Sequence, residues 1–248
     1  MNTVTAPQEV QVAPDARLAP ASQFATVPEV TLPSGIVVPS FQVARYLTGK
    51  STDGTLLIAI DAAPYVEISY HDAIAAARGA GLALITELQY LALAHDIASV
   101  AANWTGGAVG EGYLKQGLRD GEFDEAQPAS VISESPDEDR HFVLSNGEII
   151  DDVAGNAYSW VFDNVQGDDQ GILKAPFADD SISLTTAPYP SRERGTGWRP
   201  GAGAAWSGYA LIRGGYWDGG DYAGVFRLSY ARPGDADDYV GFRCTKPE

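Results

Sequence analysis

Short apolar runs separated by turn residues dominate the first two thirds of the chain. Residues 41–47 and 55–60 are apolar and flank a turn region that contains Asp53-Gly54. This arrangement predicts a β-hairpin. Residues 141–150 repeat the arrangement around Asn146-Gly147, which predicts a second hairpin.

Two stretches change to the period of an amphipathic helix. Ser69 is the predicted N-cap of the first helix, which ends at Gly79 or Gly81. Thr86 is the predicted N-cap of the second helix, and Gln89 three residues later completes a capping box. Two helices among short strands predict an α+β fold in which the helices pack on short antiparallel strands.

The composition favours one sizeable domain that follows an N-terminal arm. The chain has 248 residues with 45% hydrophobic content, and its 27 glycines and 15 prolines favour a loop-rich fold over a helical bundle. Residues 1–27 show no usable periodicity, and residues 29–39 form one or two short strands broken at Pro33-Ser34-Gly35. We expect an arm over residues 1–39, either flexible or used for attachment or oligomerisation, and a domain over residues 40–248.

The charge of the chain limits its partners. A formal net charge of −17 at pH 7 argues against nucleic acid and anionic membranes. No apolar run approaches the roughly 18 residues of a membrane span, so we expect no membrane insertion. The first residues lack the basic start and apolar core of a secretory signal. We expect a virion or extracellular-surface protein that leaves the cell without a signal peptide, or otherwise a cytoplasmic protein.

A long irregular connection between residues 166 and 205 carries two pairs of aspartates. These are Asp168, Asp169, Asp179 and Asp180. Clustered carboxylates can hold Ca²⁺, although no EF-hand spacing is present and a solvated acidic loop is the alternative. The arginines between residues 192 and 199 could pair with this acidic loop. We expect no cofactor, with calcium as the one candidate metal.

The pattern changes again between Trp217 and Val240, where hydrophobic periodicity is almost lost. Tyr, Asp, Gly and Ser with a few Arg make up this segment. Tyrosine gives a large rigid contact area and the small polar residues give adaptable hydrogen bonds, as in antibody paratopes. An ordinary long surface loop is the alternative. Turns at Gly219-Gly220 and Pro233-Gly234 predict a folded-back, irregular surface that presents four exposed tyrosines. These are Tyr216, Tyr222, Tyr230 and Tyr239.

Two frames bracket this segment, Arg213-Gly214-Gly215-x-Trp217 before it and Val240-Gly241-Phe242-Arg243-Cys244 after it. Together they resemble the ending of C-type-lectin-fold proteins of the formylglycine-generating-enzyme, or sulfatase-modifying, type. Within that superfamily they look most like the variable proteins of diversity-generating retroelements, many of which are phage receptor-binding proteins.

Earlier segments resemble the same superfamily in the same order, so that the resemblance spans about residues 40–244. They are the Leu-Ile-Thr-Glu opening of the second helix, residues 101–104 with the Gly-rich run after them, residues 144–148 and residues 154–160. One departure is Tyr158-Ser159, which stands where the family usually carries an aromatic residue followed by Glu.

The resemblance implies a C-type-lectin-like domain with a variable region over about residues 213–243. The implied scaffold, in which Trp217 and Phe242 are buried anchors, consists of Arg213, Gly214, Gly215, Trp217, Gly241, Phe242 and Arg243. The implied ligand-binding positions are Tyr216, Asp218, Tyr222, Arg227, Ser229, Tyr230, Arg232, Asp235, Asp237, Asp238 and Tyr239. The implied function is that of a phage or prophage adhesin for a protein or glycan receptor on a host cell, with a homo-oligomer as one form it could take.

The superfamily also contains enzymes, so its catalytic residues have to be sought in this chain. Formylglycine formation uses paired cysteines that hold copper, whereas this chain has only Cys244, which reads as a small buried hydrophobe. Iron-dependent relatives use a histidine triad, but His71, His95 and His141 share no ligand spacing, and we expect His71 and His95 at surface or cap positions. We therefore expect no catalysis. The alternatives are an enzyme, or a degenerate one, of the same superfamily and a structural virion protein.

Overall fold

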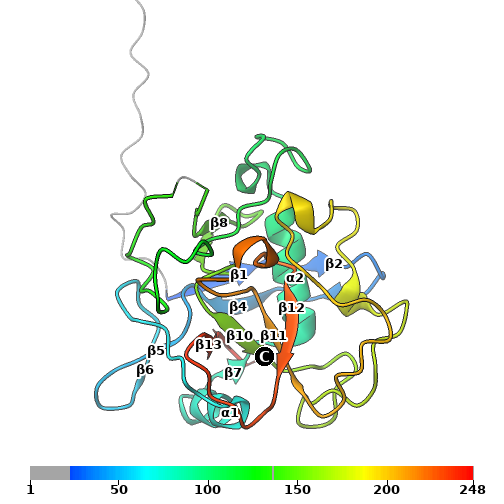
Figure 1. Cartoon of the computed structure of the whole chain (residues 1–248). Coiled ribbons are helices and arrows are strands. Elements are labelled where there is room, and N and C mark those ends of the chain that lie inside the picture. The colour runs from blue at the N-terminus through cyan, green and yellow to red at the C-terminus, as the bar shows by residue number, and fades with distance from the viewer. Residues whose placement is uncertain (1–22, 136, 248) are drawn as a thin grey trace, which may run out of the picture.

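The computed structural model describes residues 23–135 and 137–247. Within these ranges, two α-helices and several short 3₁₀ turns lie among short and mostly antiparallel strands, and long loops join them (Figure 1). This confirms the α+β class, with its two helices and its loop-rich character. The residues before position 23, where the expected arm begins, lie outside the described part of the chain.

One sheet joins the two ends of the described chain. Its strand order is β1–β4–β14–β7, with antiparallel neighbours throughout. The strands are β1 (Phe24–Val27), β4 (Phe41–Ala44), β7 (Ala83–Leu84) and β14 (Cys244–Thr245). Because β4 pairs with both β1 and β14, the first and last described strands are held on one central strand.

The expected domain boundary after residue 39 is wrong for residues 24–38, which pack on the domain. Val27 in β1 is fully buried, and the strands β2 (Val30–Thr31) and β3 (Val37–Val38) pair around the predicted break at Pro33-Ser34-Gly35. Leu32 is buried in the same core cluster as the second helix. The strand β1 alternates in burial over only four residues, too few to stand out as a period, and its pairing with β4 fixes its place.

The two predicted hairpins differ in outcome. The second is confirmed, since β8 (His141–Val143) pairs with β9 (Ile149–Asp151) around Asn146-Gly147. The first turn is also confirmed, but its arms are β5 (Gly49–Lys50) and β6 (Leu56–Leu57). The more apolar residues 41–44 lie instead in the interior of the first sheet, because that position buries more of their surface.

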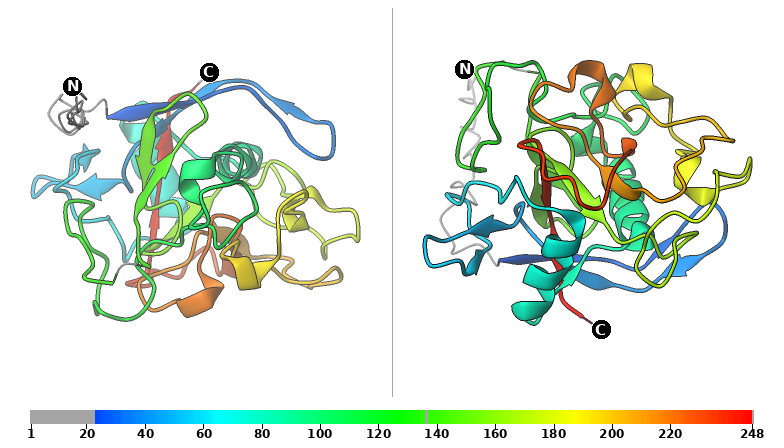
Figure 2. Two further views of the ribbon diagram at one scale, coloured as in Figure 1. Left: turned by 90° about the horizontal axis from the view of Figure 1, so that it is seen from above. Right: turned by 60° about the horizontal axis from the view of Figure 1, so that its bottom comes forward.

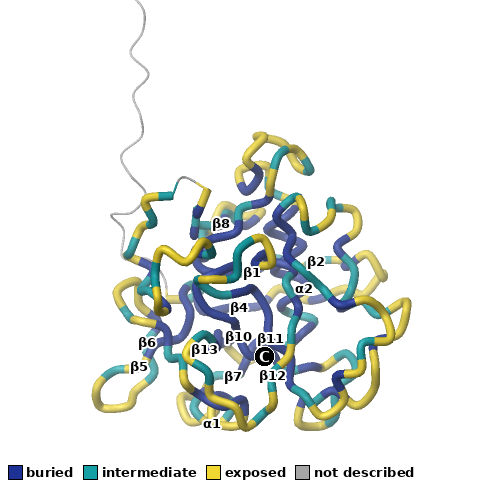
Figure 3. The backbone as a smooth tube through the Cα atoms, viewed as in Figure 1, coloured by how far each residue is buried: buried dark blue, intermediate teal, exposed yellow. Residues whose placement is uncertain are grey.

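A second sheet lies at the centre of the molecule, in the order β12–β11–β10–β13 (Figure 1). Its strands are β10 (Tyr158–Val161), β11 (Ala210–Arg213), β12 (Leu228–Ala231) and β13 (Val240–Phe242), and β10 runs parallel to β13. Leu211 packs into one core cluster and its neighbour Ile212 into another. The sheet therefore has apolar packing on both faces, which Figure 3 shows as a buried centre under exposed loops.

The two helices begin where the sequence predicts. Helix α1 (Tyr70–Gly79) is capped by Ser69, whose hydroxyl accepts a bond from the backbone N–H of Asp72 at 3.1 Å. Helix α2 (Glu87–Ala98) carries the complete capping box of Thr86 and Gln89. Nearly all of α2 is buried, whereas α1 packs on the sheet with one face. The short 3₁₀ turns are η2 (Ala101–Asn103), η3 (Ile182–Leu184), η4 (Arg192–Arg194) and η5 (Gly220–Tyr222).

Candidate functional site: a tyrosine face on a buried frame

The segment between Trp217 and Val240 folds back on itself as predicted. At its first turn, the N–H of Gly219 donates to the carbonyl of Tyr216 at 2.9 Å, and η5 follows. At its second turn, the N–H of Asp235 donates to the carbonyl of Arg232 at 3.0 Å, across Pro233-Gly234. Between the turns runs β12, which is an edge strand of the central sheet.

Buried arginines hold the two frames. Arg213 is fully buried and forms an ion pair with Glu87, which is also fully buried, at the start of α2. Arg243 is also buried, and its guanidinium donates to the carbonyls of Ala44 and Asp151 at 2.6 and 2.5 Å. Both arginines tie the frames to elements far away in the sequence, as the expected scaffold role requires.

Two glycines in the first frame have backbone conformations that favour glycine. Gly214 has φ +97° and Gly215 has φ +100°. A Cβ atom on Gly214 would lie 2.8 Å from the carbonyl oxygen of Val153, and one on Gly215 would lie 2.7 Å from Ala223. Larger residues would meet both backbone strain and collision at these two positions.

The two expected aromatic anchors differ. Phe242 is fully buried and its ring centroid lies 6.1 Å from that of Tyr65, so it is an anchor as expected. Trp217 is only half-buried, and the expectation of a buried anchor is wrong for it. It packs against a small cluster of Leu47, Ala126 and Ala157, which is too small to enclose an indole ring.

The four tyrosines of the segment lie at the surface. Tyr222 and Tyr230 are 50% and 40% exposed, and Tyr216 and Tyr239 are half-buried. None of the four is fully buried, and the expected exposure is met by Tyr222 and Tyr230 and only in part by Tyr216 and Tyr239. Their rings are large rigid surfaces within reach of solvent, as a binding surface requires.

Aromatic contacts join these tyrosines into one row. At one end, Tyr239 lies 5.1 Å from Tyr216, and Tyr216 stacks on Tyr158 at 5.7 Å between centroids. At the other end, Tyr230 lies 4.4 Å from Trp206 and 4.7 Å from Tyr209.

Arg227 lies at the centre of this row and connects its ends. Its Nε donates to the hydroxyl of Tyr158 at 3.0 Å, and its Cζ lies 4.7 Å from the Trp198 ring and 5.6 Å from the Tyr222 ring. Trp198 in turn lies 6.5 Å from Trp206, which completes the row. We call this row the tyrosine face: Tyr216, Tyr222, Arg227, Tyr230 and Tyr239, with Tyr158, Trp198, Trp206 and Tyr209.

Four members of the tyrosine face were not predicted from the sequence, because they lie outside the segment between Trp217 and Val240. Trp198 comes from the irregular connection, Trp206 and Tyr209 lie between that connection and β11, and Tyr158 comes from β10. Residues 198–209 carry three aromatic side chains close together, which is the one signal that the sequence offered. The sequence could not show that this connection lies beside the segment.

All eleven expected ligand-binding positions are at least partly exposed. Beyond those already described, Asp218, Arg232, Asp235 and Asp238 are exposed, and Ser229 and Asp237 are half-buried. Burial and the neighbouring Asp237 carboxylate raise the pKa of Tyr239, so its hydroxyl stays protonated and able to donate. That these positions contact a ligand stays a prediction.

The lone cysteine lies in the core. Cys244 is fully buried, and burial raises the pKa of its thiol to about 11. Its backbone N–H donates to the Thr48 hydroxyl at 3.2 Å. A thiol of such high pKa holds its proton at neutral pH, so it is a poor nucleophile and a poor metal ligand.

His95 differs from the expectation of a surface or cap residue. It is only 6% exposed and lies edge-on to Phe226 at 4.9 Å and tilted to Tyr189 at 5.8 Å. Burial, with the charge of Arg213 as a smaller cause, lowers the pKa of His95 to about 4. His71 is exposed as expected, and His141 contacts Asp151 in the second hairpin.

The acidic connection does not pair with the arginines that follow it. Arg194 donates to the carbonyls of Gly110 and Gly112, and Arg199 to the carbonyl of Leu184, so the expected ion pairing is wrong. Over residues 23–135 and 137–247, no three His, Cys, Asp or Glu side chains converge as a metal site. Calcium binding stays an untested prediction.

In the part of the chain that the structure describes, no helix has the length and apolar character of a membrane span.

No family model and no curated protein matches this chain. Its structure is similar to that of PvdO from Pseudomonas aeruginosa, with 17% identity over 90% of this chain and 91% of that one, at a TM-score of 0.42. It is similar to Treponema denticola variable protein 1, with 14% identity over 92% of each chain, at a TM-score of 0.42.

A third similar structure is the I1 variant of Major Tropism Determinant, with 17% identity and a TM-score of 0.41. The match covers 90% of this chain but 54% of that protein, so this chain spans about half of its length. A variable protein and a tropism determinant are thus among the solved structures that this chain is similar to.

Proposed function

We propose that this chain is a ligand-binding protein of the C-type-lectin-like, formylglycine-generating-enzyme type, which presents the tyrosine face as a diversified surface. One observation carries the proposal. Every one of the eleven expected ligand-binding positions is at least partly exposed, whereas six of the seven scaffold positions are buried. The buried six are Arg213, Gly214, Gly215, Gly241, Phe242 and Arg243.

This separation suits a surface that changes while its fold does not. Replacing exposed side chains usually changes the free energy of unfolding by within about 0.5 kcal/mol, whereas truncating a buried aromatic residue costs about 3–5 kcal/mol. Sequence variation at these eleven positions therefore alters the contact surface and leaves the core intact, including the buried Val225, Phe226 and Leu228 between the frames.

Binding fits the chemistry of the tyrosine face better than catalysis does. Its members offer ring faces, hydroxyls and one guanidinium, and Cys244 lies in the core as a protonated thiol. The partner is a protein or glycan receptor on a host-cell surface, and the chain acts on a virion or extracellular surface as a phage or prophage adhesin. Nucleic acid and membrane insertion are not part of this proposal.

A display library tests this proposal. The eleven ligand-binding positions are randomised together, and the displayed proteins are sorted for resistance to protease and then for binding to hen egg lysozyme. We expect most members to stay folded and specific binders to be enriched. A control library that randomises the six buried scaffold positions should lose its folded members. The proposal fails if the first library unfolds as extensively as the control.

A further inference from the structure

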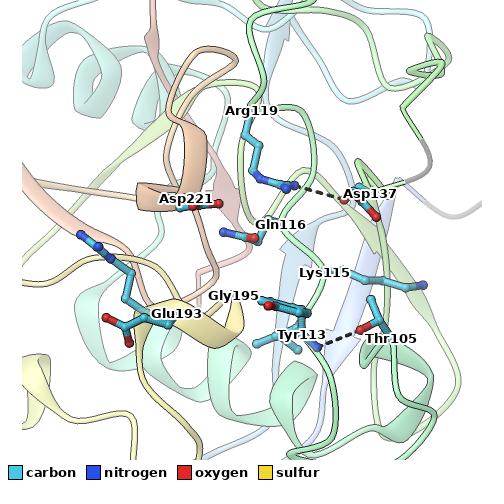
Figure 4. A pocket seen from close by; sticks show the side chains of 11 residues that line it. Thr105, Tyr113, Lys115, Gln116, Arg119, Asp137, Glu193, Gly195 and Asp221 are labelled. Carbon is cyan, nitrogen blue, oxygen red and sulfur yellow. Dashed lines mark hydrogen bonds between the residues drawn. The ribbon is translucent and has the colours of Figure 1, made fainter.

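A pocket opens beside the tyrosine face. It has a volume of about 500 Å³ and lies where the loop after Trp104 meets η4 and η5 (Figure 4). In the close-up, Glu193 and Asp221 lie on one side of the pocket, Arg119 and Asp137 on the other, and Gln116 between them. Of its lining residues, only Asp221 belongs to the segment between the frames.

The first feature of this pocket is an arginine without a carboxylate partner. The Cζ of Arg192 lies 4.7 Å from the Tyr222 ring, and within the described residues no carboxylate lies within ion-pairing distance of it. The chain has 33 acidic and 16 basic residues, so carboxylate partners are plentiful. A guanidinium held by stacking keeps its N–H groups available for the planar, two-point binding of a carboxylate.

The second feature is a set of carboxylates around the same cavity. Asp137, Glu193 and Asp221 all line it. A hydrogen bond from Ser191 lowers the pKa of Glu193, which therefore stays ionised at neutral pH. Ionised carboxylates repel a second anion but accept hydrogen bonds from hydroxyl groups. A ligand that suits both features carries one anionic group and several hydroxyls.

The third feature is aromatic. Tyr113 lines the pocket and is 57% exposed, and Tyr222, which is 50% exposed, lies against Arg192. A cavity of a few hundred Å³ has the size of a small-ligand site. Its mostly polar and charged lining suits a ligand with several hydroxyls.

We propose that this pocket binds an acidic saccharide, a sugar ring that carries a carboxylate. The carboxylate pairs with Arg192, the ring hydroxyls donate to Asp137, Glu193 and Asp221, and Tyr113 packs on the ring. An acidic peptide is a poorer occupant, because it has no hydroxyls for these three carboxylates. The proposal goes beyond the tyrosine face: of the lining residues only Asp221 belongs to the variable segment, so variants that keep Asp221 and the Tyr222 ring against Arg192 would share the pocket as a common anchor.

Ligand-observed NMR and calorimetry with defined probes test this inference. The probes are methyl glucuronide, methyl glucoside, which lacks the carboxylate, and acetate, which lacks the hydroxyls. We expect the glucuronide to bind at least about tenfold more tightly than either of the others. Arg192→Gln should weaken glucuronide binding at least about tenfold without changing the melting temperature, and Asp221→Asn should weaken it less. Arg78→Gln, an exposed change on α1, is the control and should have no effect.

Several results would overturn the inference. Equal binding of the glucoside would show that the charge is not recognised, and equal binding of acetate would show a simple anion site. No binding of the glucuronide at millimolar concentration, or an unchanged affinity in Arg192→Gln, would also contradict it. Tighter binding of a hexaglutamate peptide than of the glucuronide would point to a protein partner instead. The display library leaves Arg192 unchanged, so this inference and the proposed function can fail separately.

Discussion

At the residue scale, the aromatic residues of the two frames differ in how deeply they are buried. Phe242 and Trp217 stand in equivalent frames, yet Phe242 is fully enclosed and Trp217 is half-exposed beside a three-residue cluster. The stability that a side chain contributes follows from the apolar area that it buries. Phe242 should therefore contribute more to the free energy of unfolding than Trp217.

Substituting these two aromatic residues measures that difference. We expect Phe242→Ala to lower the free energy of unfolding by about 3–5 kcal/mol, because a buried aromatic ring leaves a cavity. Trp217→Ala should cost less, about 1–3 kcal/mol, since part of its ring already contacts water. Urea titrations of both variants check this order. Curves that coincide with that of the parent would show that the frame assignment is wrong.

The burial of neutral His95 makes the free energy of unfolding fall as the pH is lowered. The pKa of His95 is about 4 in the folded chain and 6.5 as an ordinary value, so the unfolded chain binds the proton first. The stability from neutral His95 is fully present above about pH 6.5 and is lost as the pH falls toward 4.

The variant His95→Phe keeps a ring of similar shape without the titrating group. Between pH 7 and pH 4, we expect the parent to lose about 2–3 kcal/mol more stability than this variant. Chemical denaturation at a series of pH values gives both curves. Parallel pH dependences would contradict the neutral, buried state of His95. Carboxylates that titrate in this range affect both proteins and cancel in the comparison.

The reactivity of the Cys244 thiol tests whether this side chain is buried. We expect Cys244 to be unreactive toward a disulfide reagent in the folded protein and to react fully once the chain is unfolded, because its thiol is buried and protonated. Cys244→Ser should keep ligand binding, with a modest loss of stability. Rapid labelling under native conditions would rule out the buried position.

At the element scale, local signals located the elements better than their partners. The capping box of Thr86 and Gln89 and the turn at Asn146-Gly147 act within a few residues, so the sequence displays them directly. The pairing of β4 with β1 and β14 joins residues up to about two hundred positions apart, and no local pattern encodes it. For this reason the turn of the first hairpin was predictable from the sequence, whereas its arms, β5 and β6, were not.

The first frame depends on a single backbone conformation. Gly214→Ala should lower the free energy of unfolding by about 1–3 kcal/mol, because the new Cβ meets the carbonyl of Val153 at a φ of +97°. Gly234→Ala is a matched control in the second turn, where no atom lies within 4 Å of the new Cβ. Its melting temperature should stay close to that of the parent. Equal melting temperatures for the two variants would mean that the frame tolerates a side chain at Gly214.

At the scale of the whole molecule, the central sheet places the tyrosine face. Apolar clusters pack on both faces of this sheet and fix β11 and β13, which carry the two frames. In Figure 2 the orange-to-red C-terminal part of the chain folds against the green and teal segments from the middle of the chain. The segment between the frames was recognisable from its composition and turns. Its connection through Arg227 to Tyr158, Trp198 and Trp206 was not, because those residues reach the face only through the tertiary fold.

The central claim is that the tyrosine face binds the ligand and that the frame beneath it is independent. The most direct measurement compares cell binding by the parent with that by a variant in which Tyr222, Ser229, Tyr230 and Tyr239 are all Ala. Fluorescently labelled proteins are incubated with a panel of bacterial cells and counted by flow cytometry, with melting temperatures recorded alongside.

We expect the parent to label a subset of the panel and the fourfold variant to label none, while the two melt within a few degrees of each other. Labelling of the same cells by the variant at the level of the parent would contradict the claim. So would a loss of binding that is accompanied by a melting temperature as low as that of Phe242→Ala.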